Sequence, residues 1–512
     1  MIRNIFSVSA LTLVSRLFGF VRDLMFAAVL GAGALADAFF VAFRIPNQFR
    51  AIFGEGAFNA AFVPAFARAT AERGQNVALV FADHVFALLL FAQLVLLAAA
   101  MVFMPAVVML LAPGFSDDPV RFPAAVELTR ITFPYLAFIS LTVLVGGVLN
   151  AVGRFAAYAA AQILLSVSII AALLLAGRFE SPGHAAAWGV VVAGLLQFLV
   201  VTGDALKANV MVELRRPRVT SDVKLFWRNF VPATVGSAGS QIAVLADTII
   251  ASYLVVGAVS WLYYADRLNQ LPIGVIAVAV GTVLLSEMSR RIAAGDEAGA
   301  RHAQLRAIEL TLVFSLPAVA AFVLVPDVIM KALFMRGAFT EEDALKSAAA
   351  LAAYGLGLTA LVLVRPFTIS FHSRGDTRTP VIAVGVSVVI NVALKVALMR
   401  PLGHVALALG TSAGVWVNVM MLAWFARRQG LIGLDDRAKR VLPRLFLSFG
   451  ILCATLVLVG LGIRTAAPRL DAKLMLVALM GAGGLAYGAA LVILFGKDFI
   501  ADLKRLRRGV AG

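Results

Sequence analysis

The sequence predicts an all-α polytopic membrane protein of about 14 transmembrane helices, arranged as two pseudo-symmetric six-helix lobes plus two C-terminal helices. Of its 512 residues, 62% are hydrophobic and only 14% are charged, which is far more apolar than a soluble chain of ordinary composition. Apolar windows of about 20 residues recur along the whole chain, and this is the length that a helix needs to cross a bilayer. Both observations favour the membrane class.

The predicted spans follow one another with short polar connections. In chain order they lie near residues 5–30, 35–53, 78–111, 124–151, 157–177, 185–206, 226–256, 259–287, 305–326, 346–371, 378–399, 403–426, 441–463 and 472–495. Charges at Arg16, Arg22 and Asp23 interrupt the first apolar run, so we interpret it as a retained helix and not as a signal peptide.

Lysine and arginine predict the orientation of these spans. If the N-terminus is cytoplasmic, about 27 of the 44 basic residues fall in cytoplasmic segments and about nine on the opposite side. This asymmetry predicts that both termini are cytoplasmic. It also explains the net charge of +16, which in a soluble protein would suggest nucleic acid as a partner. We expect no nucleic-acid binding.

A weak internal repeat at an offset of about 223 residues predicts the lobes. It superposes residues 36–44 (ADAFFVAFR) on residues 259–267 (VSWLYYADR), and therefore Arg44 on Arg267. The predicted domains are an N-lobe at 1–222, a C-lobe at 223–430, and at 431–512 the last two helices with a basic tail.

Motifs for soluble enzyme chemistry are absent from the sequence or wrongly placed. There is no phosphate-binding GxxxxGK[ST] loop and no HExxH, the five histidines are scattered, and Cys453 is the only cysteine. Residues 410–414 (GTSAG) match G-x-S-x-G, but they lie inside an apolar span, where small residues favour close helix packing. We therefore expect no cofactor, no metal site and no catalytic residues.

Charged residues inside the spans indicate a functional site, because an arginine near the bilayer centre costs at least about 2.5 kcal/mol on insertion scales. The helices at 5–30, 35–53 and 259–287 contribute Arg16, Arg22, Arg44, Arg50 and Arg267, against Asp23, Asp37, Glu55 and Asp266. Internal pairs are one explanation: Arg22 or Arg16 with Asp23, Arg44 with Asp37, and Arg267 with Asp266. Such pairs leave a surplus of cations, and the planar fork of arginine suits phosphate oxygens. The three helices are predicted to form an anion site.

A second pair of charges lies in strongly apolar surroundings. Asp247 and Lys395 fall in the spans at 226–256 and 378–399, where each is costly alone. We expect a salt bridge between them inside the second lobe.

Five segments form a recognisable pattern: SRLFGFVRD at 15–23, ADAFFVAFRIPN at 36–47, FRAIFGEGAFNAAFVP at 49–64, ITFPY at 131–135 and SWLYYADRLNQLPIGVIAVAVGTVLL at 260–285. Together they resemble the MurJ/MviN family of bacterial lipid II flippases, within the wider group of multidrug, oligosaccharidyl-lipid and polysaccharide exporters. The resemblance implies a transporter of the inner membrane, not an enzyme. It implies alternating access that moves undecaprenyl-diphosphate-linked disaccharide-peptide, with lipid II, membrane lipids and other cell-wall synthesis proteins as partners.

The resemblance also assigns roles to individual residues. It implies that Arg16, Arg22, Arg50 and Arg267 bind substrate in the cavity, and that Asp23, Asp37, Asn47 and Glu55 hold polar and gate positions. Some relatives resemble sodium-coupled transporters, with a site to which Asp247 and Asn391 would correspond, but Lys395 would place a fixed cation there. Alternatives are an exporter of another polyprenyl-linked oligosaccharide, a drug antiporter, or a membrane enzyme acting on polyprenyl phosphates.

Overall fold

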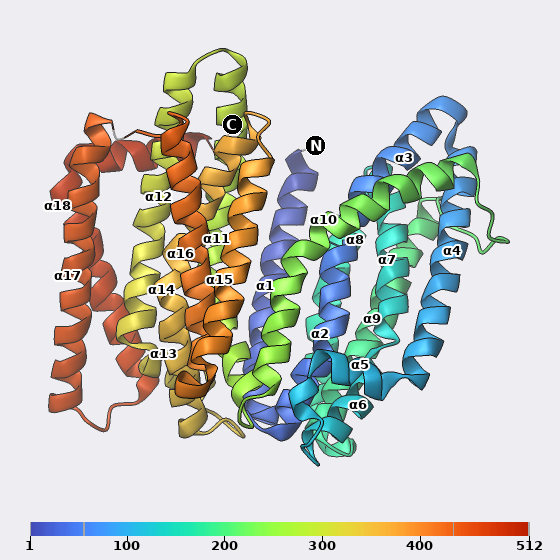
Figure 1. Cartoon of the computed structure of the whole chain (residues 1–512), viewed down its shortest axis with the longest axis horizontal. Coiled ribbons are helices and arrows are strands. Elements are labelled where there is room, and N and C mark those ends of the chain that lie inside the picture. The colour runs from blue at the N-terminus through green and yellow to red at the C-terminus, as the bar shows by residue number, and fades with distance from the viewer. Residues whose placement is uncertain (1, 55–56, 434, 510–512) are drawn as a thin grey trace. The chain divides into compact units, whose positions relative to one another are not determined.

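The structure, a computed structural model, describes residues 2–54, 57–433 and 435–509. Every regular element within these ranges is a helix (Figure 1), which confirms the all-α fold. The chain forms two compact units, Met1–Ser260 with Arg336–Phe339 (unit 1) and Trp261–Met335 with Thr340–Gly512 (unit 2). We describe each unit by itself. The N-lobe at 1–222 and the C-lobe at 223–430, which the repeat predicts, remain a prediction that is separate from this division into units.

Unit 1 contains ten α-helices, two short 3-10 helices and the first residues of α11. The bounds are α1 Ile2–Leu30, α2 Ala34–Gly54, α3 Ala57–Arg73, α4 Gln75–Val102, α5 Met104–Leu111, η1 Pro113–Phe115, α6 Arg121–Thr132, α7 Tyr135–Ala151, α8 Ala156–Leu174, η2 Ala176–Arg178, α9 Pro182–Lys207, α10 Ser221–Ser252 and α11 Ala258–Ala293. Prolines mark two of the breaks: Pro105 opens α5, and Pro134 precedes α7. The predicted spans at 78–111 and 124–151 are therefore each two helices.

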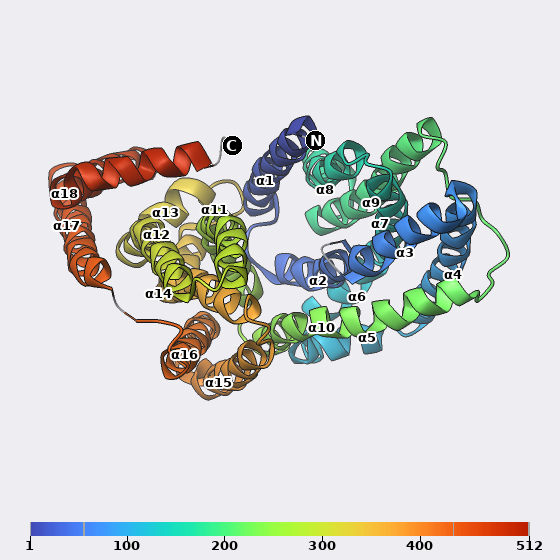
Figure 2. The same cartoon turned by 90° about the horizontal axis from the view of Figure 1, so that it is seen from above.

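Unit 1 is built around α2, α7 and α9. Helix α7 packs against α2, α3, α4 and α9, while α8 packs between α1 and α9. Helix α10 packs against α2, α3, α4 and α5, and Figure 2 shows it running alongside α5. Its N-terminus is capped by Thr220, whose hydroxyl accepts from the N–H of Val223. In this structure α10 thus belongs to unit 1 by its packing.

A linker between α9 and α10 is fixed to the side of α4. The buried carboxylate of Asp83 accepts a hydrogen bond from the N–H of Glu213 at 2.7 Å and pairs with Nε of Arg215 at 2.8 Å. The neighbouring side chains of Val210 and Val212 are buried as well. One carboxylate therefore ties an irregular segment to the helical core.

Unit 2 contains the rest of α11 and seven further helices. The bounds are α12 Glu297–Leu324, α13 Pro326–Phe334, α14 Glu341–His372, α15 Arg378–Leu402, α16 Val405–Arg428, α17 Asp436–Ala466 and α18 Ala472–Gly509. Helix α14 is central: it packs against α12, α13 and α16, while α15 packs on α16, and α17 packs on α12 and α18. A capping box formed by Thr340 and Asp343 starts α14, and Asp343 also accepts from Nε1 of Trp261 at 2.8 Å.

The residues 410–414 lie within α16, so they form no strand-to-helix turn. A Cβ on Gly410 would meet Cγ of Lys395 at 2.5 Å, and one on Gly414 would meet Cβ of Asn391 at 2.7 Å. The small residues let α15 and α16 approach closely, which confirms the packing interpretation of this motif.

Ten helical segments of the described chain are long and apolar enough to cross a membrane, and one of them, Arg121–Ala151, consists of α6 and α7 together. They correspond to ten of the predicted spans. The other four coincide with α1, α2, α10 and α11, which are 29, 21, 32 and 36 residues long. The predicted number of spans therefore agrees with the helices, while α3 was not predicted.

Candidate functional site

An ion pair neutralises the first buried arginine of unit 1. Nη2 of Arg22 lies 2.8 Å from Oδ1 of the adjacent Asp23, and both side chains are buried on α1. The guanidinium also lies 5.6 Å from the ring centre of Phe26 and 5.9 Å from that of Phe43, distances that suit cation–π attraction. The predicted pairing of Arg22 with Asp23 is confirmed.

The carboxylate of Asp37 accepts hydrogen bonds from the start of α11 and does not form the predicted ion pair with Arg44. Its fully buried carboxylate accepts from the N–H of Gly257 at 2.7 Å, from the N–H of Ser260 at 2.9 Å and from the hydroxyl of Ser260 at 2.6 Å. These are donors at the start of α11, where the first N–H groups have no partner within the helix. Asp37 therefore caps α11 from the first turn of α2.

The proposed pair between Arg44 and Asp37 is wrong for this structure, because the donors of α11 occupy the carboxylate. Nε of Arg44 instead donates to Oγ1 of Thr248 on α10, at 3.0 Å. This hydroxyl is neutral. Within the described parts of the chain, Arg44 has no carboxylate at ion-pair distance, and the same holds for the exposed Arg16 on α1.

Two further polar side chains, Asn47 and Arg50, lie on the following turns of α2. Nε and Nη2 of Arg50 lie 3.4 and 3.3 Å from the side-chain oxygen of Asn47, three residues earlier. Both side chains are half-buried. Together α1 and α2 thus place three predicted substrate-binding arginines and Asn47 in unit 1.

The fourth arginine of the predicted cluster lies in unit 2. The guanidinium of Arg267 on α11 lies 4.7 Å from the ring centre of Tyr263, one helical turn earlier. Nη1 of Arg267 is 3.5 Å from Oε1 of Gln270, and the amide of Gln270 donates to Asp266. The expected convergence of Arg267 with the arginines of α1 and α2 remains a prediction.

Backbone contacts close one end of unit 1, where α1 ends and α2 begins. The N–H of Ala338 donates to the carbonyl of Ala28 at 2.8 Å. Gly31 and Gly337 both have positive φ, and a Cβ on either would lie within 2.5 Å of a backbone oxygen. Only glycine permits so close an approach of two chain segments.

The same end holds the segment before α11. The N–H of Gly114 donates to Oγ of Ser252 at 2.9 Å, and Nη1 of Arg121 donates to the carbonyl of Leu254 at 3.1 Å. With the Asp37 cap, these bonds explain why the segment up to Ser260 belongs to unit 1.

Three further predicted residues stay untested. Glu55 lies outside the described residues. Asp247 is half-buried on α10 in unit 1, and Lys395 is buried on α15 in unit 2. Their salt bridge remains a prediction.

The sequence interpretation missed Thr248 and Ser260 as partners of the charged residues. A signal for Ser260 was present, because the repeat offset places it at the position equivalent to Asp37. No local pattern indicated Thr248, which meets Arg44 from 204 residues away.

An all-helical chain with at least ten membrane-crossing helices and arginines on its first two helices is typical of a membrane transporter. Its fold is similar to that of a multidrug transporter of the MATE family in an inward-facing conformation, with a TM-score of 0.67 at 17% identity, over 83% of this chain and 98% of that chain. The chain belongs to the lipid II flippase MurJ family, whose model matches residues 26–487. Transport, not catalysis, is therefore the activity of its class.

Relatives agree with this assignment over most of the chain. A probable lipid II flippase MurJ of Rhizobium meliloti (strain 1021) is 39% identical, covering 100% of this chain and 96% of the relative. The lipid II flippase MurJ of Burkholderia cenocepacia is 36% identical, covering 84% of each. A solved lipid II flippase MurJ in an inward closed conformation matches with a TM-score of 0.82 at 26% identity, over 96% of this chain and 99% of that chain.

Proposed function

We propose that this chain moves lipid II from the cytoplasmic to the periplasmic leaflet of the bacterial inner membrane. The observation that carries the proposal is that Arg16 and Arg44, on the first two helices, have no carboxylate at ion-pair distance in the described chain. The diphosphate of a polyprenyl-linked precursor supplies the missing negative charge, and arginine forks bind phosphate oxygens with two parallel hydrogen bonds.

Arg22 and Arg50 belong to the same substrate site in this proposal. Asp23 fixes the guanidinium of Arg22, and Asn47 lies against that of Arg50. We assign a substrate-binding role to Arg267 of the predicted C-lobe as well. Binding of the diphosphate compensates the cationic charge and permits the lobes to move, while the acyl tail stays in lipid.

Alternating access in this proposal requires the closed end of unit 1 to open. Under the predicted boundary after residue 222, Asp37 and Ser260 belong to different lobes, so their bonds are part of a gate. The backbone approach between Ala28 and Ala338 belongs to the same gate. With both termini cytoplasmic, this end faces the periplasm, and it opens only after the headgroup has bound.

A leaflet-resolved assay of lipid II tests the proposal. Cells depleted of the wild-type protein should accumulate lipid II on the cytoplasmic side, and expression of Arg16→Ala or Arg267→Ala should not relieve this. The control is Arg130→Ala, which removes an exposed arginine of α6. All three variants should insert to wild-type levels. Normal flipping by Arg16→Ala would exclude the proposed role of the arginines.

The arginines also separate the proposal from the alternatives. A drug antiporter for organic cations needs carboxylates and aromatic rings around its substrate, whereas Arg16 of α1 and Arg44 of α2 have no carboxylate at ion-pair distance in the described chain. A precursor with another sugar would share the diphosphate. Competition between lipid II and other polyprenyl-diphosphate lipids for flipping by the purified protein distinguishes these substrates.

A further inference from the structure

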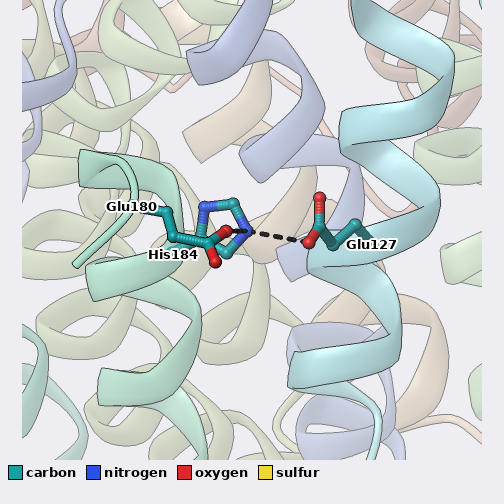
Figure 3. A group of neighbouring side chains, drawn as sticks. All are labelled: Glu127, Glu180 and His184. Carbon is teal, nitrogen blue, oxygen red and sulfur yellow. Dashed lines mark ion pairs between the residues drawn. The ribbon is translucent and has the colours of Figure 1, made fainter.

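Three groups that are able to bind a metal ion meet in unit 1 between α6 and α9 (Figure 3). Glu127 comes from α6, Glu180 lies just before α9, and His184 lies in the first turn of α9. One ligand atom from each lies within 4.8 Å of the others. The cluster is on different helices from the arginines of the proposed substrate site.

The local sequence explains why these side chains converge. Ser181 caps α9 by accepting from the N–H of His184 at 3.3 Å, and Pro182 occupies the first helical position. His184 lies in the first turn of α9, and Glu180 lies four residues earlier, directly before the cap. At Gly183 a Cβ would meet Cδ1 of Leu35 on α2 at 2.9 Å, so glycine favours the close packing of α9 at this point.

The distances match a tetrahedral metal centre. Nε2 of His184 lies 3.2 Å from Oε1 of Glu127 and 3.6 Å from Oε2 of Glu180. Zinc binds nitrogen and carboxylate oxygen at about 2.0–2.2 Å, which separates neighbouring ligands of a tetrahedron by about 3.3–3.6 Å. Both printed separations therefore agree with a shared ion.

The imidazole is oriented as a metal ligand would be. Nδ1 of His184 lies 2.7 Å from Oγ of Ser181, which fixes the ring, as an oxygen partner on the second nitrogen does in metal sites. Nε2 is buried and lies at ion-pair distance from both carboxylates, but it makes no hydrogen bond of good geometry within the described chain. A metal ion between the three groups would give this nitrogen a directed partner.

We propose that Glu127, Glu180 and His184 bind a divalent transition-metal ion, with Zn²⁺ as the metal that fits best. One imidazole and two carboxylates suit Zn²⁺ better than Ca²⁺ or Mg²⁺, which bind oxygen ligands. Water completes the coordination, since Glu127 and Glu180 are 56% and 83% exposed. The bound ion ties α6 to α9. The scattered histidines of the sequence predicted no metal site, and the only signal was the four-residue spacing of Glu180 and His184.

Zinc binding to the full-length protein tests the proposal directly. The purified protein in detergent micelles is stripped with EDTA, passed through a desalting column and titrated with Zn²⁺ by calorimetry and against a chromophoric zinc indicator. We expect one zinc per chain. Glu127→Gln and His184→Ala should each weaken binding by at least about 10-fold, the low end of the effect of disturbing a metal site.

The control is His302→Ala. His302 pairs with one carboxylate, that of Asp435 at 3.1 Å, and belongs to no three-ligand group in the described chain. This variant should bind zinc like the wild type. Unchanged affinity in both Glu127→Gln and His184→Ala, or loss of binding in His302→Ala alone, would overturn the proposal.

A measurement on the wild-type protein removes any dependence on how the variants fold. X-ray absorption of the zinc-loaded protein should show only nitrogen and oxygen neighbours at about 2.0–2.2 Å, including the outer-shell scattering of one imidazole. A spectrum without imidazole scattering would count against the site. Arg16→Ala should retain zinc binding, so failure of the flippase proposal and failure of the metal site are separate outcomes.

Discussion

Replacing Asp37 by Ala removes the acceptor of three hydrogen bonds at the start of α11. Hydrogen bonds to a charged acceptor contribute about 1.5–3 kcal/mol each, so their sum is an upper limit of about 5–9 kcal/mol. The variant no longer desolvates a carboxylate, and the loss of a helix N-cap alone costs about 0.5–2 kcal/mol. We expect Asp37→Ala to lower the free energy of unfolding by about 2–4 kcal/mol.

Ser260→Ala gives an internal comparison. It removes the hydroxyl donor but leaves both backbone donors on Asp37, so we expect a loss of about 1–2 kcal/mol. Because the single variants remove one shared bond, their effects should not add, and the double variant should show a coupling of about 1–2 kcal/mol. Asp117→Ala, at an exposed position, should change stability by less than about 0.5 kcal/mol.

Equilibrium unfolding in mixed micelles with an increasing fraction of SDS, followed by tryptophan fluorescence, measures these differences. The expected order of destabilisation is Asp37→Ala, then Ser260→Ala, then Asp117→Ala. An Asp37→Ala protein as stable as Asp117→Ala would refute the capping role. So would additive effects of the Asp37 and Ser260 substitutions, since the shared bond would then contribute nothing.

Three further outcomes follow from the ion pairs and caps of unit 1. Asp23→Ala leaves the buried guanidinium of Arg22 without its carboxylate and should destabilise by about 3–5 kcal/mol in the same unfolding assay, whereas Arg22→Met with Asp23→Ala should lose less. Asp83→Ala frees the linker at 209–220, so limited proteolysis should cut there at least about 10-fold faster than in the wild type. An uncut linker would contradict this. The N–H of Arg121, the first residue of α6, donates to the carboxylate of Asp118 and holds the pKa of Asp118 below its ordinary value of 3.8. The stability that this carboxylate contributes is complete above pH 3.8 and is lost as the pH falls through the lower folded value, and Asp118→Asn should flatten that part of a pH titration of the thermal midpoint.

Hydropathy was sufficient to predict the helical fold, because each span must satisfy its own backbone in lipid and therefore carries its signal locally. The pair of Arg22 and Asp23 was predictable for the same reason, since the residues are adjacent. Helix α3 was missed because its sequence, with Arg68 and Arg73 near its end, has too little continuous apolar length for a span.

Charge alone could not predict which partner each residue takes. The sequence offered Arg44 as a partner for Asp37 in the same helix, but the structure provides three donors at the unsatisfied start of α11. Helix ends present such donors only after the chain has folded. The cluster of Glu127 and His184 depends likewise on two helices packing together, so its residues looked unrelated in the sequence.

The attachment of the linker to α4 limits how far α10 can travel. Asp83 holds the chain at Arg215, six residues before α10 begins at Ser221. A fully extended chain spans at most about 3.3–3.6 Å per residue, so the first turn of α10 reaches no more than about 20–22 Å from that point. Without the attachment, the free linker would begin at Lys207, the last residue of α9, which is 14 residues before Ser221. The start of α10 would then be able to lie up to about 46–50 Å from Lys207. The buried carboxylate of Asp83 thus limits the distance over which the start of α10 can move while α4 and α9 remain folded.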